Sequence, residues 1–447
     1  MKFQSFRLLP VCAALLAAGT MLGAQARCID EDNVEMRTGG NANGMPIDAG
    51  AARANLQNMV NEAQRRSQAL GAVRLLAEAA AIDVDEARSG HWPQLTANAF
   101  LGATETKVAE VEESRGKQGR VGLTLSAPLF DGGRTTQLTD WRKNLAEAAR
   151  LGEINAQEQV ALQTVSLAIE RSRYRLQAQV YQQYARKMSC LVEALETIVR
   201  ADRGRTSELV QAQKNLQQAE ISQAQTLSMV RQVETRLRRF VGDALPPSEG
   251  LSSVLLTPPP LPEILAQAET APDIAQLSAQ ALAAEALSRS VSAARMPQVN
   301  LVANGSQVRG AGNSANWSAG INVSVPLFNL PAGHAVDSSQ KRAAAAKLQR
   351  ADALEARKFR MTEVHEQAIS SFDRARRVVE VLRDSDRVRN FTLQQWQQLG
   401  RRSLFDVMAS EGDHYGLRVA YVNALYDGQQ SNALLWSLGH GVQSRLK

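Results

Sequence analysis

Residues 317–329 read WSAGINVSVPLFN, and this stretch decides the fold. From Trp317 to Val325 every second residue is apolar, and the residues between are small or polar. This period of two is typical of a β-strand with one apolar face. After Pro326 the alternation stops, and a long helical pattern follows. The stretch therefore predicts a strand that gives way to a helix.

The stretch belongs to a set of motifs that occurs twice. Four short motifs recur in the same order, about 200 residues apart. The pairs are WPQL at 92–95 with MPQV at 296–299, APLFD at 127–131 with VPLFN at 325–329, GRTS at 204–207 with GRRS at 400–403, and VG at 241–242 with LG at 438–439. We interpret the mature chain as a tandem duplication, with repeats at 27–244 and 263–447 and a Pro-rich linker at 245–262.

Two hairpins are predicted, one in each repeat. The alternating segments are 94–105, 119–127, 298–308 and 317–327. Each is about the 9 to 11 residues that a tilted strand needs to cross a bilayer. The connections, Lys107 to Gly119 and Arg309 to Asn316, are polar and rich in charge or Gly, as in outer loops. Because alternation is a weak signal for each strand, a soluble surface hairpin remains the alternative.

The remaining pattern is helical. Proline is absent from 134–203 and from 335–399, which predicts two long helices, the first about 105 Å long. Shorter helices are predicted at 67–89, 207–241, 272–295 and 403–438. The lengths of two shorter helices nearly sum to one long helix. The sequence thus predicts a mainly α fold with membrane β-hairpins, in which each long helix is lined by two stacked shorter ones.

The first residues have the pattern of a signal peptide. Lys2 and Arg7 precede an apolar run, and Ala24-Gln25-Ala26 is a cleavage motif, so we expect residues 1–26 to be removed. No later apolar run is long enough for a membrane-spanning helix. The sequence does not settle whether Cys28 and Cys190 pair or whether Cys28 is lipidated.

Charge and residue spacing exclude several functions. Without Lys2 and Arg7, 49 basic and 45 acidic side chains remain, and they are interspersed, so we expect no nucleic-acid binding. His365-Glu366 is not followed by the second histidine of HExxH, and there is no CxxC, GxSxG or phosphate-binding loop. We predict no enzyme activity, no catalytic residue, no metal and no cofactor.

The order of helix, hairpin, PLF motif and long helix, together with GRRSLFDVMASE at 400–411, resembles the TolC family of outer-membrane channel-tunnels. The resemblance covers essentially the whole mature chain. It implies a homotrimer in the cell outer membrane, with a 12-stranded barrel and an α-helical tunnel that projects into the periplasm. It also implies an equatorial belt, built here from the leader and first helix near 51–66, the linker and the C-terminal tail. Four strands in one chain cannot close a barrel alone, which agrees with this assembly.

By the same resemblance, the two GR(T/R)S turns lie at the periplasmic tip of the tunnel. Arg402 takes the position of a gate arginine and Asp406 that of an acidic residue at the aperture. Relatives carry an aspartate or a tyrosine where this chain has Ala409 and Gln397, so the closed state needs other contacts or is weaker. Arg205 and Glu208 are candidates for these contacts. The alternative is that the arginines are solvated turn residues.

The glycines and serines of these turns have a predicted structural role. Gly204 and Gly400 suit a left-handed helix end, with Ser207 and Ser403 beginning the next helix.

The sequence GRRSLFDVMASEGDHY at 400–415 resembles the type I secretion branch of the family. This branch implies an inner-membrane ABC transporter and a periplasmic adaptor as partners. A drug or small-molecule efflux channel of the same fold is the first alternative. A periplasmic coiled-coil adaptor or scaffold, or a soluble helical interaction protein, is the second. Cargo and transporter cannot be read from the sequence.

Overall fold

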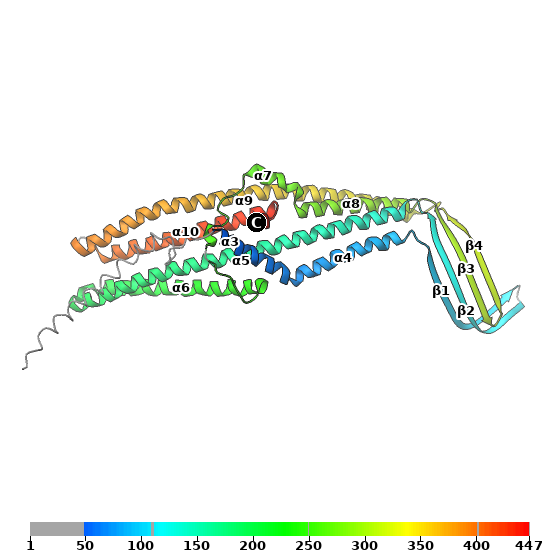
Figure 1. Ribbon diagram of the computed structural model, residues 1–447, viewed down its shortest axis with the longest axis horizontal. Helices are drawn as coiled ribbons and strands as arrows, with labels where there is room; N and C mark the ends of the chain where they lie inside the picture. Colours follow the sequence, from blue (N-terminus) through cyan, green and yellow to red (C-terminus); the bar gives the residue numbers. More distant parts are fainter. Residues whose placement is uncertain (1–48, 109–110, 249, 400–401, 447) are drawn as a thin grey trace, which may run out of the picture.

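The computed structural model describes residues 49–108, 111–248, 250–399 and 402–446. The molecule is elongated, with a helical body and a four-stranded sheet that bends away at one end (Figure 1). Residues 1–48 lie outside the described part, and with them the predicted signal peptide and Cys28. In the described part of the chain, no helix is long and apolar enough to cross a membrane.

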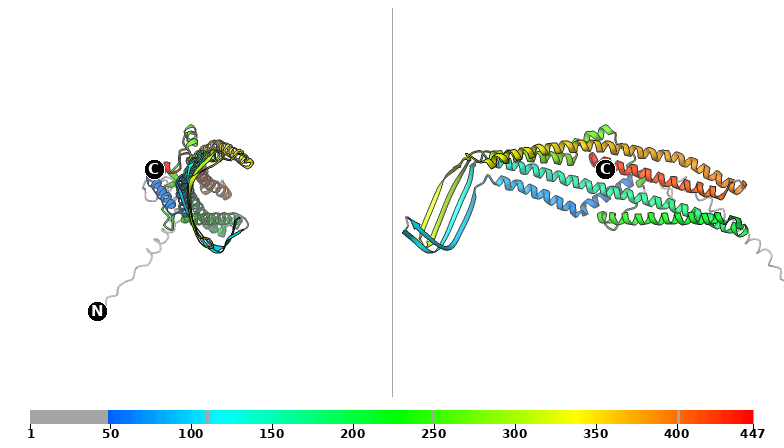
Figure 2. Two further views of the ribbon diagram at one scale, coloured as in Figure 1. Left: turned by 90° about the vertical axis from the view of Figure 1, so that its right-hand side faces the viewer. Right: turned by 180° about the vertical axis from the view of Figure 1, so that it is seen from behind.

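Two long helices form the length of the body. These are α5 (Arg134–Ala201) and α9 (Leu330–Leu399). Each packs along two shorter helices: α5 with α4 (Gln68–Ser89) and α6 (Thr206–Val241), and α9 with α8 (Pro272–Ala293) and α10 (Leu404–Leu438). Because α5 also packs against α8 and α10, the two halves form one wall (Figures 1 and 2).

The PLF motif ends a strand and begins a long helix in both halves. Asp131 accepts hydrogen bonds from the backbone N–H groups of Gly133 (2.9 Å) and Thr135 (2.6 Å). In the second half, Asn329 accepts from the N–H of Ala332 at 3.1 Å. These oxygens satisfy donors that a helix N-terminus leaves without partners. This capping explains why the motif ends in Asp or Asn.

The long second helix begins earlier than predicted. We expected α9 to begin at 335, but it begins at Leu330. Pro331 is suited to the first helical turn, where no backbone N–H is required. Smaller differences occur at the ends of α5 and α8, which stop at Ala201 and Ala293. Ser67 caps α4, since its side chain accepts from the N–H of Leu70.

The sheet is antiparallel, in the order β1-β2-β3-β4. Its strands are β1 (Gln94–Val108), β2 (Val111–Phe130), β3 (Gln298–Gly310) and β4 (Ser314–Ser324). The outer loop predicted from Lys107 to Gly119 is wrong, because β1 and β2 continue their pairing through most of it. Backbone pairing does not require apolar side chains, so the charges there do not end the strands. β4 ends before the predicted 327, close to Pro326, which has no N–H to donate.

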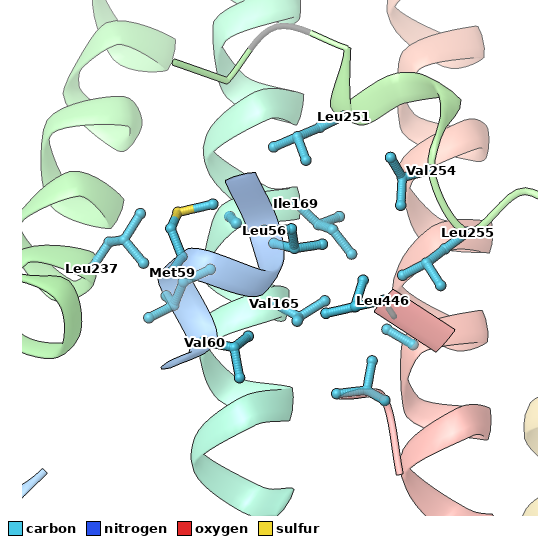
Figure 3. Packing of buried hydrophobic residues seen from close by; sticks show 14 of the residues in the cluster. Leu56, Met59, Val60, Val165, Ile169, Leu237, Leu251, Val254, Leu255 and Leu446 are labelled. Atoms are coloured by element: carbon cyan, nitrogen blue, oxygen red, sulfur yellow. The ribbon is translucent and has the colours of Figure 1, made fainter. Parts of the chain in front are cut away.

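The core lies halfway along the body, where three segments distant in sequence meet. α3 (Ala49–Arg66) inserts Leu56, Met59 and Val60 between α5 and α6 (Figure 3). Leu251, Val254 and Leu255 of the linker and Leu446 of the C-terminal segment close the same cluster. The linker contains η2 (Leu251–Ser253), and α7 (Leu261–Ala266) begins at its end and is followed by η3 (Gln267–Thr270). The C-terminal segment contains α11 (Gln443–Leu446).

Two fully buried amides hold the linker on this core. Gln429 on α10 donates to the carbonyl oxygens of Leu251 (2.9 Å) and Val254 (2.7 Å). Asn432, one turn later, donates to the carbonyl of Leu255 at 2.7 Å. Leu255 has a positive φ of 58°, which a leucine adopts only when its surroundings impose it. The linker is therefore fixed and is not a loose tether between the halves.

Candidate functional site

The sheet has one apolar face and one polar face. The pairing places Leu95 beside Leu125, Leu125 beside Ala303, and Ala303 beside Ala319, so odd-numbered residues of all four strands share a face. Exposed apolar side chains on this face are Leu95, Leu101, Val121, Leu123, Leu301, Trp317, Ile321 and Val323. The opposite face carries Thr96, Asn98, Thr124, Ser126, Asn300, Asn304 and Asn322. This is the pattern of a sheet that separates lipid from water.

Both edges of the sheet lack a neighbouring strand within the described chain. β1 pairs only with β2, and β4 only with β3. Every described residue of β4 is exposed, including its apolar side chains. Unpaired backbone groups are costly in a bilayer, at several kcal/mol each. A sheet of this kind needs further strands on both sides before it can lie in a membrane.

The second-repeat turn lies at the end of the body opposite the sheet. Arg402 Nη1 is 3.9 Å from Asp406 Oδ2, and Arg402 Nε donates to Gln395 Oε1 at 3.2 Å. Ser403 caps α10: its Oγ accepts from the N–H of Asp406, and the Asp406 carboxylate accepts from the N–H of Ser403. This capping box gives Asp406 a structural role in addition to any role at an aperture. Both charged side chains are about half exposed, at 54% and 46%.

The first-repeat turn brings its two predicted residues together in a similar way. Arg205 Nη1 is 3.9 Å from Glu208 Oε2, and Arg205 Nε is 3.9 Å from Asp202 Oδ2. Asp202, which we did not predict, also accepts from the N–H of Gly204 at 2.9 Å. Each turn therefore forms its own local ion pair within this protomer.

The predicted role of the turn glycine is wrong for Gly204. α5 ends with Asp202 in an extended conformation (φ −135°, ψ 98°). Gly204 lies inside a short 3-10 turn (Arg203–Arg205) and has no positive φ. The Asp202 side chain, not a left-handed glycine, supports this turn. Ser207 is already within α6, and Gly400 lies outside the described residues.

A buried ionic cluster connects the two halves and lies further from the tip than the ion pairs of the two turns. The Glu411 side chain on α10 is fully buried. Its oxygens lie 3.5 Å from Arg389 Nη1 on α9 and 3.8 Å from Lys187 Nζ on α5. Arg389, only 4% exposed, also pairs with Asp386 at 2.9 Å. Three helices from both repeats thus meet at one carboxylate.

Aromatic and apolar side chains surround this cluster. The rings of Tyr184 and Tyr415 lie 5.0 Å apart, and burial, with the charge of Glu411 added, raises the pKa of Tyr184. Towards the tip, side chains of α5, α6 and α10 form a small core of Met188, Leu191, Val192, Leu195, Ala212, Leu404, Val407 and Met408. The two helical hairpins are therefore packed together close to their turns.

Cys190 lies on α5 in the same region and is disulfide-bonded. The other two cysteines of the chain, Cys12 and Cys28, lie outside the described residues. Whether Cys28 is its partner, and whether Cys28 is lipidated, are questions that lie outside the described residues.

The sequence model of the family described as "Outer membrane efflux protein" matches residues 59–243. No curated protein matches the chain in sequence. Three solved outer-membrane channels have a similar structure. The VceC protein of Vibrio cholerae is 19% identical, with a TM-score of 0.75, and the match covers 87% of this chain and 97% of that chain.

The other two channels have similarly low sequence identity to this chain. The open state of the Neisseria gonorrhoeae MtrE channel is 16% identical, with a TM-score of 0.75 and coverage of 88% and 90%. The Campylobacter jejuni CmeC channel is 16% identical, with a TM-score of 0.74 and coverage of 87% and 86%.

These structural matches show that the chain has the fold of outer-membrane channels of this kind. Residues 59–243 are similar in sequence to the outer membrane efflux protein family, and the described chain has the TolC-like fold. The predicted resemblance to the TolC family and the predicted mainly α fold with two β-hairpins are confirmed, whereas the trimeric 12-stranded barrel stays a prediction.

Proposed function

We propose that three copies of this chain form a passive exit duct in the outer membrane, with a tunnel in the periplasm. The observation that carries the proposal is the sheet with one exposed apolar face, one polar face and two open edges. Three such sheets supply twelve strands, which close every edge and leave a lumen wide enough for water. Two copies would supply eight strands, whose interior side chains would fill the barrel.

The helical body supports the same assembly. Apolar side chains are exposed along the outer helices of the wall, among them Leu75, Leu76 and Ile82 on α4 and Leu348, Phe359 and Phe391 on α9. Side chains of this kind are suited to the contact between neighbouring protomers in a ring.

The duct would take its cargo from an inner-membrane ABC transporter through a periplasmic adaptor, as in type I protein secretion. The sequence of residues 400–415, which resembles the type I secretion branch, supports type I protein secretion. The description of the matched family names efflux, so export of small molecules is the second candidate function. The chain itself would have no enzyme activity, and the energy for transport would come from the transporter.

One experiment tests the assembly. Outer-membrane protein is extracted in detergent and run in SDS with and without heating. We expect a heat-sensitive species near three protomer masses, because a closed barrel keeps its backbone bonds in SDS. A monomer or dimer in the periplasmic fraction would contradict the proposal and favour an adaptor or scaffold. Loss of a secreted protein from a deletion strain, without increased drug sensitivity, would support type I secretion over efflux.

The tip turns are proposed as the periplasmic gate, with Arg402 and Asp406 at the aperture and Arg205 and Glu208 as further contacts. Replacing Arg402 and Asp406 together with alanine is expected to raise the resting conductance in planar bilayers, because both charged groups at the aperture are removed. Arg402→Ala alone, which leaves the Ser403 capping box intact, should raise it partly. Alanines at the exposed Asp373 and Arg376 pair on α9 serve as the control. Equal conductance in all variants would overturn the gate assignment.

A further inference from the structure

Within residues 94–105, 115–126, 298–310 and 314–324, the polar face of the sheet contains a single ionisable side chain. By the strand register, this face carries the even-numbered residues of 94–105, 115–126, 298–310 and 314–324. In these described segments all of them are neutral except Arg120 on β2. The other charged residues of the same segments, Glu105, Arg115, Lys117 and Arg309, are odd-numbered and lie on the opposite face.

The neighbours of Arg120 leave its charge unbalanced. Its Cα partners are Phe100 on β1 and Val308 on β3, and neither side chain bears a charge. Within the described residues, no carboxylate lies at ion-pair distance from Arg120, whereas Glu105 pairs with Arg115 at 3.9 Å on the other face. The Arg120 side chain is exposed. A guanidinium stays protonated at any physiological pH.

The position of Arg120 along the strands is also defined. Its row continues through Val308 to Ser314, the first residue of β4, so it lies level with the end of the short β3–β4 hairpin. The β1–β2 hairpin extends further, to Val108 and Val111. In the proposed barrel this end is the one away from the helical tunnel, since α4, α5, α8 and α9 all join the sheet at its other end (Figure 1).

We propose that Arg120 forms a positive collar in the lumen near the outer mouth of the duct, which favours anions over cations. The inference rests on the proposed trimer, because three-fold symmetry places three copies of Arg120 at one level of a lumen whose other residues in these segments are neutral. Rings of Arg or Lys are a known basis of anion preference in pores. Small inorganic anions, and acidic groups on the exported cargo, are the species that this collar attracts.

The first test is ion selectivity. The full-length trimer, Arg120→Gln and Arg120→Glu are placed in planar bilayers across a KCl gradient, and the chloride-to-potassium permeability ratio is obtained from the reversal potential. We expect the ratio to fall about twofold or more in Arg120→Gln and to fall further in Arg120→Glu. Arg309→Gln is the matched control, since it removes an arginine at the neighbouring row on the opposite face. We expect it to leave the ratio unchanged.

The second test measures the charge close to Arg120 directly. A narrow periplasmic end of the tunnel could dominate the ion selectivity of the whole channel, but it does not affect this local measurement. A cysteine is introduced at Ser306, two residues from Val308 on the polar face. Its reaction rates with an anionic and a cationic thiosulfonate are compared in the Arg120 and Arg120→Gln backgrounds. We expect the anionic reagent to lose a severalfold advantage in Arg120→Gln, because the nearby positive charge is removed.

The outcomes separate the two proposals. SDS-resistant trimers whose reagent-rate ratio does not change on Arg120→Gln would overturn the collar alone. If wild-type protein forms no SDS-resistant trimer, both the proposed assembly and the collar fail. If trimers form and the rate ratio changes as expected, the collar is supported, and trimer formation by Arg120→Gln shows that the variant still folds.

Discussion

Replacing Glu411 with alanine is expected to lower the free energy of unfolding by about 3 to 5 kcal/mol, the usual cost of removing one partner from a buried ion pair. The Glu411 side chain is fully buried and lies at ion-pair distance from both Arg389 and Lys187. Without it, Lys187 at 11% exposure loses this carboxylate in the interior, and Arg389 at 4% exposure loses one of its two carboxylate neighbours and keeps Asp386. A buried cation is strongly disfavoured when its counter-ion is removed.

The measurement is denaturant or thermal unfolding followed by helical circular dichroism. Glu411→Gln keeps the shape of the side chain and removes only its charge, so it separates the ionic contribution from packing. Glu363→Ala is the control, because Glu363 belongs to an exposed pair with Arg360 on α9. Exposed pairs contribute about 1 kcal/mol or less. A loss in Glu411→Ala no larger than in this control would mean that the cluster does not stabilise the joint between the repeats.

The sequence predicted the parts of the fold that depend on local patterns. Proline-free runs with helical periodicity located α5 and α9 to within a few residues, and alternation located all four strands. Predictions failed where a backbone contact decided the outcome. At Gly204, the Asp202 side chain holds the turn, and no rule about glycine identifies it. In β1 and β2, backbone pairing extends the strands through a charged segment.

The ionic cluster could not be predicted for a different reason. Lys187, Arg389 and Glu411 belong to three helices, and each is a charged residue in a helical pattern, which usually means a solvated face. Only the packing of α5 and α9 against α10 brings them together in the interior. Arg120 is an intermediate case. The alternation of β2 places Arg120 on the polar face of the strand. That no carboxylate pairs with it follows only from the strand register.

The largest effect is expected from a charge on the apolar face of the sheet. Leu123 lies midway along this face, with Ala97 and Gly305 as its Cα partners and Trp317 in the same row. An arginine at the bilayer midplane of a membrane barrel costs about 2 to 4 kcal/mol. Since a trimer carries three copies, Leu123→Arg is expected to abolish the SDS-resistant species and the outer-membrane fraction of the protein.

The adjacent residue provides the matched control. Thr124 lies on the opposite face, beside Thr96 and Asn304. In the proposed barrel, Thr124→Arg points its charge into water and should leave trimer yield within about twofold of wild type, because lumen substitutions alter selectivity and not insertion. A soluble scaffold predicts a different result, since neither face would meet lipid and both arginines would be tolerated. Equal trimer yields for the two variants would therefore contradict the barrel, whereas loss confined to Leu123→Arg identifies the lipid-facing side of the sheet.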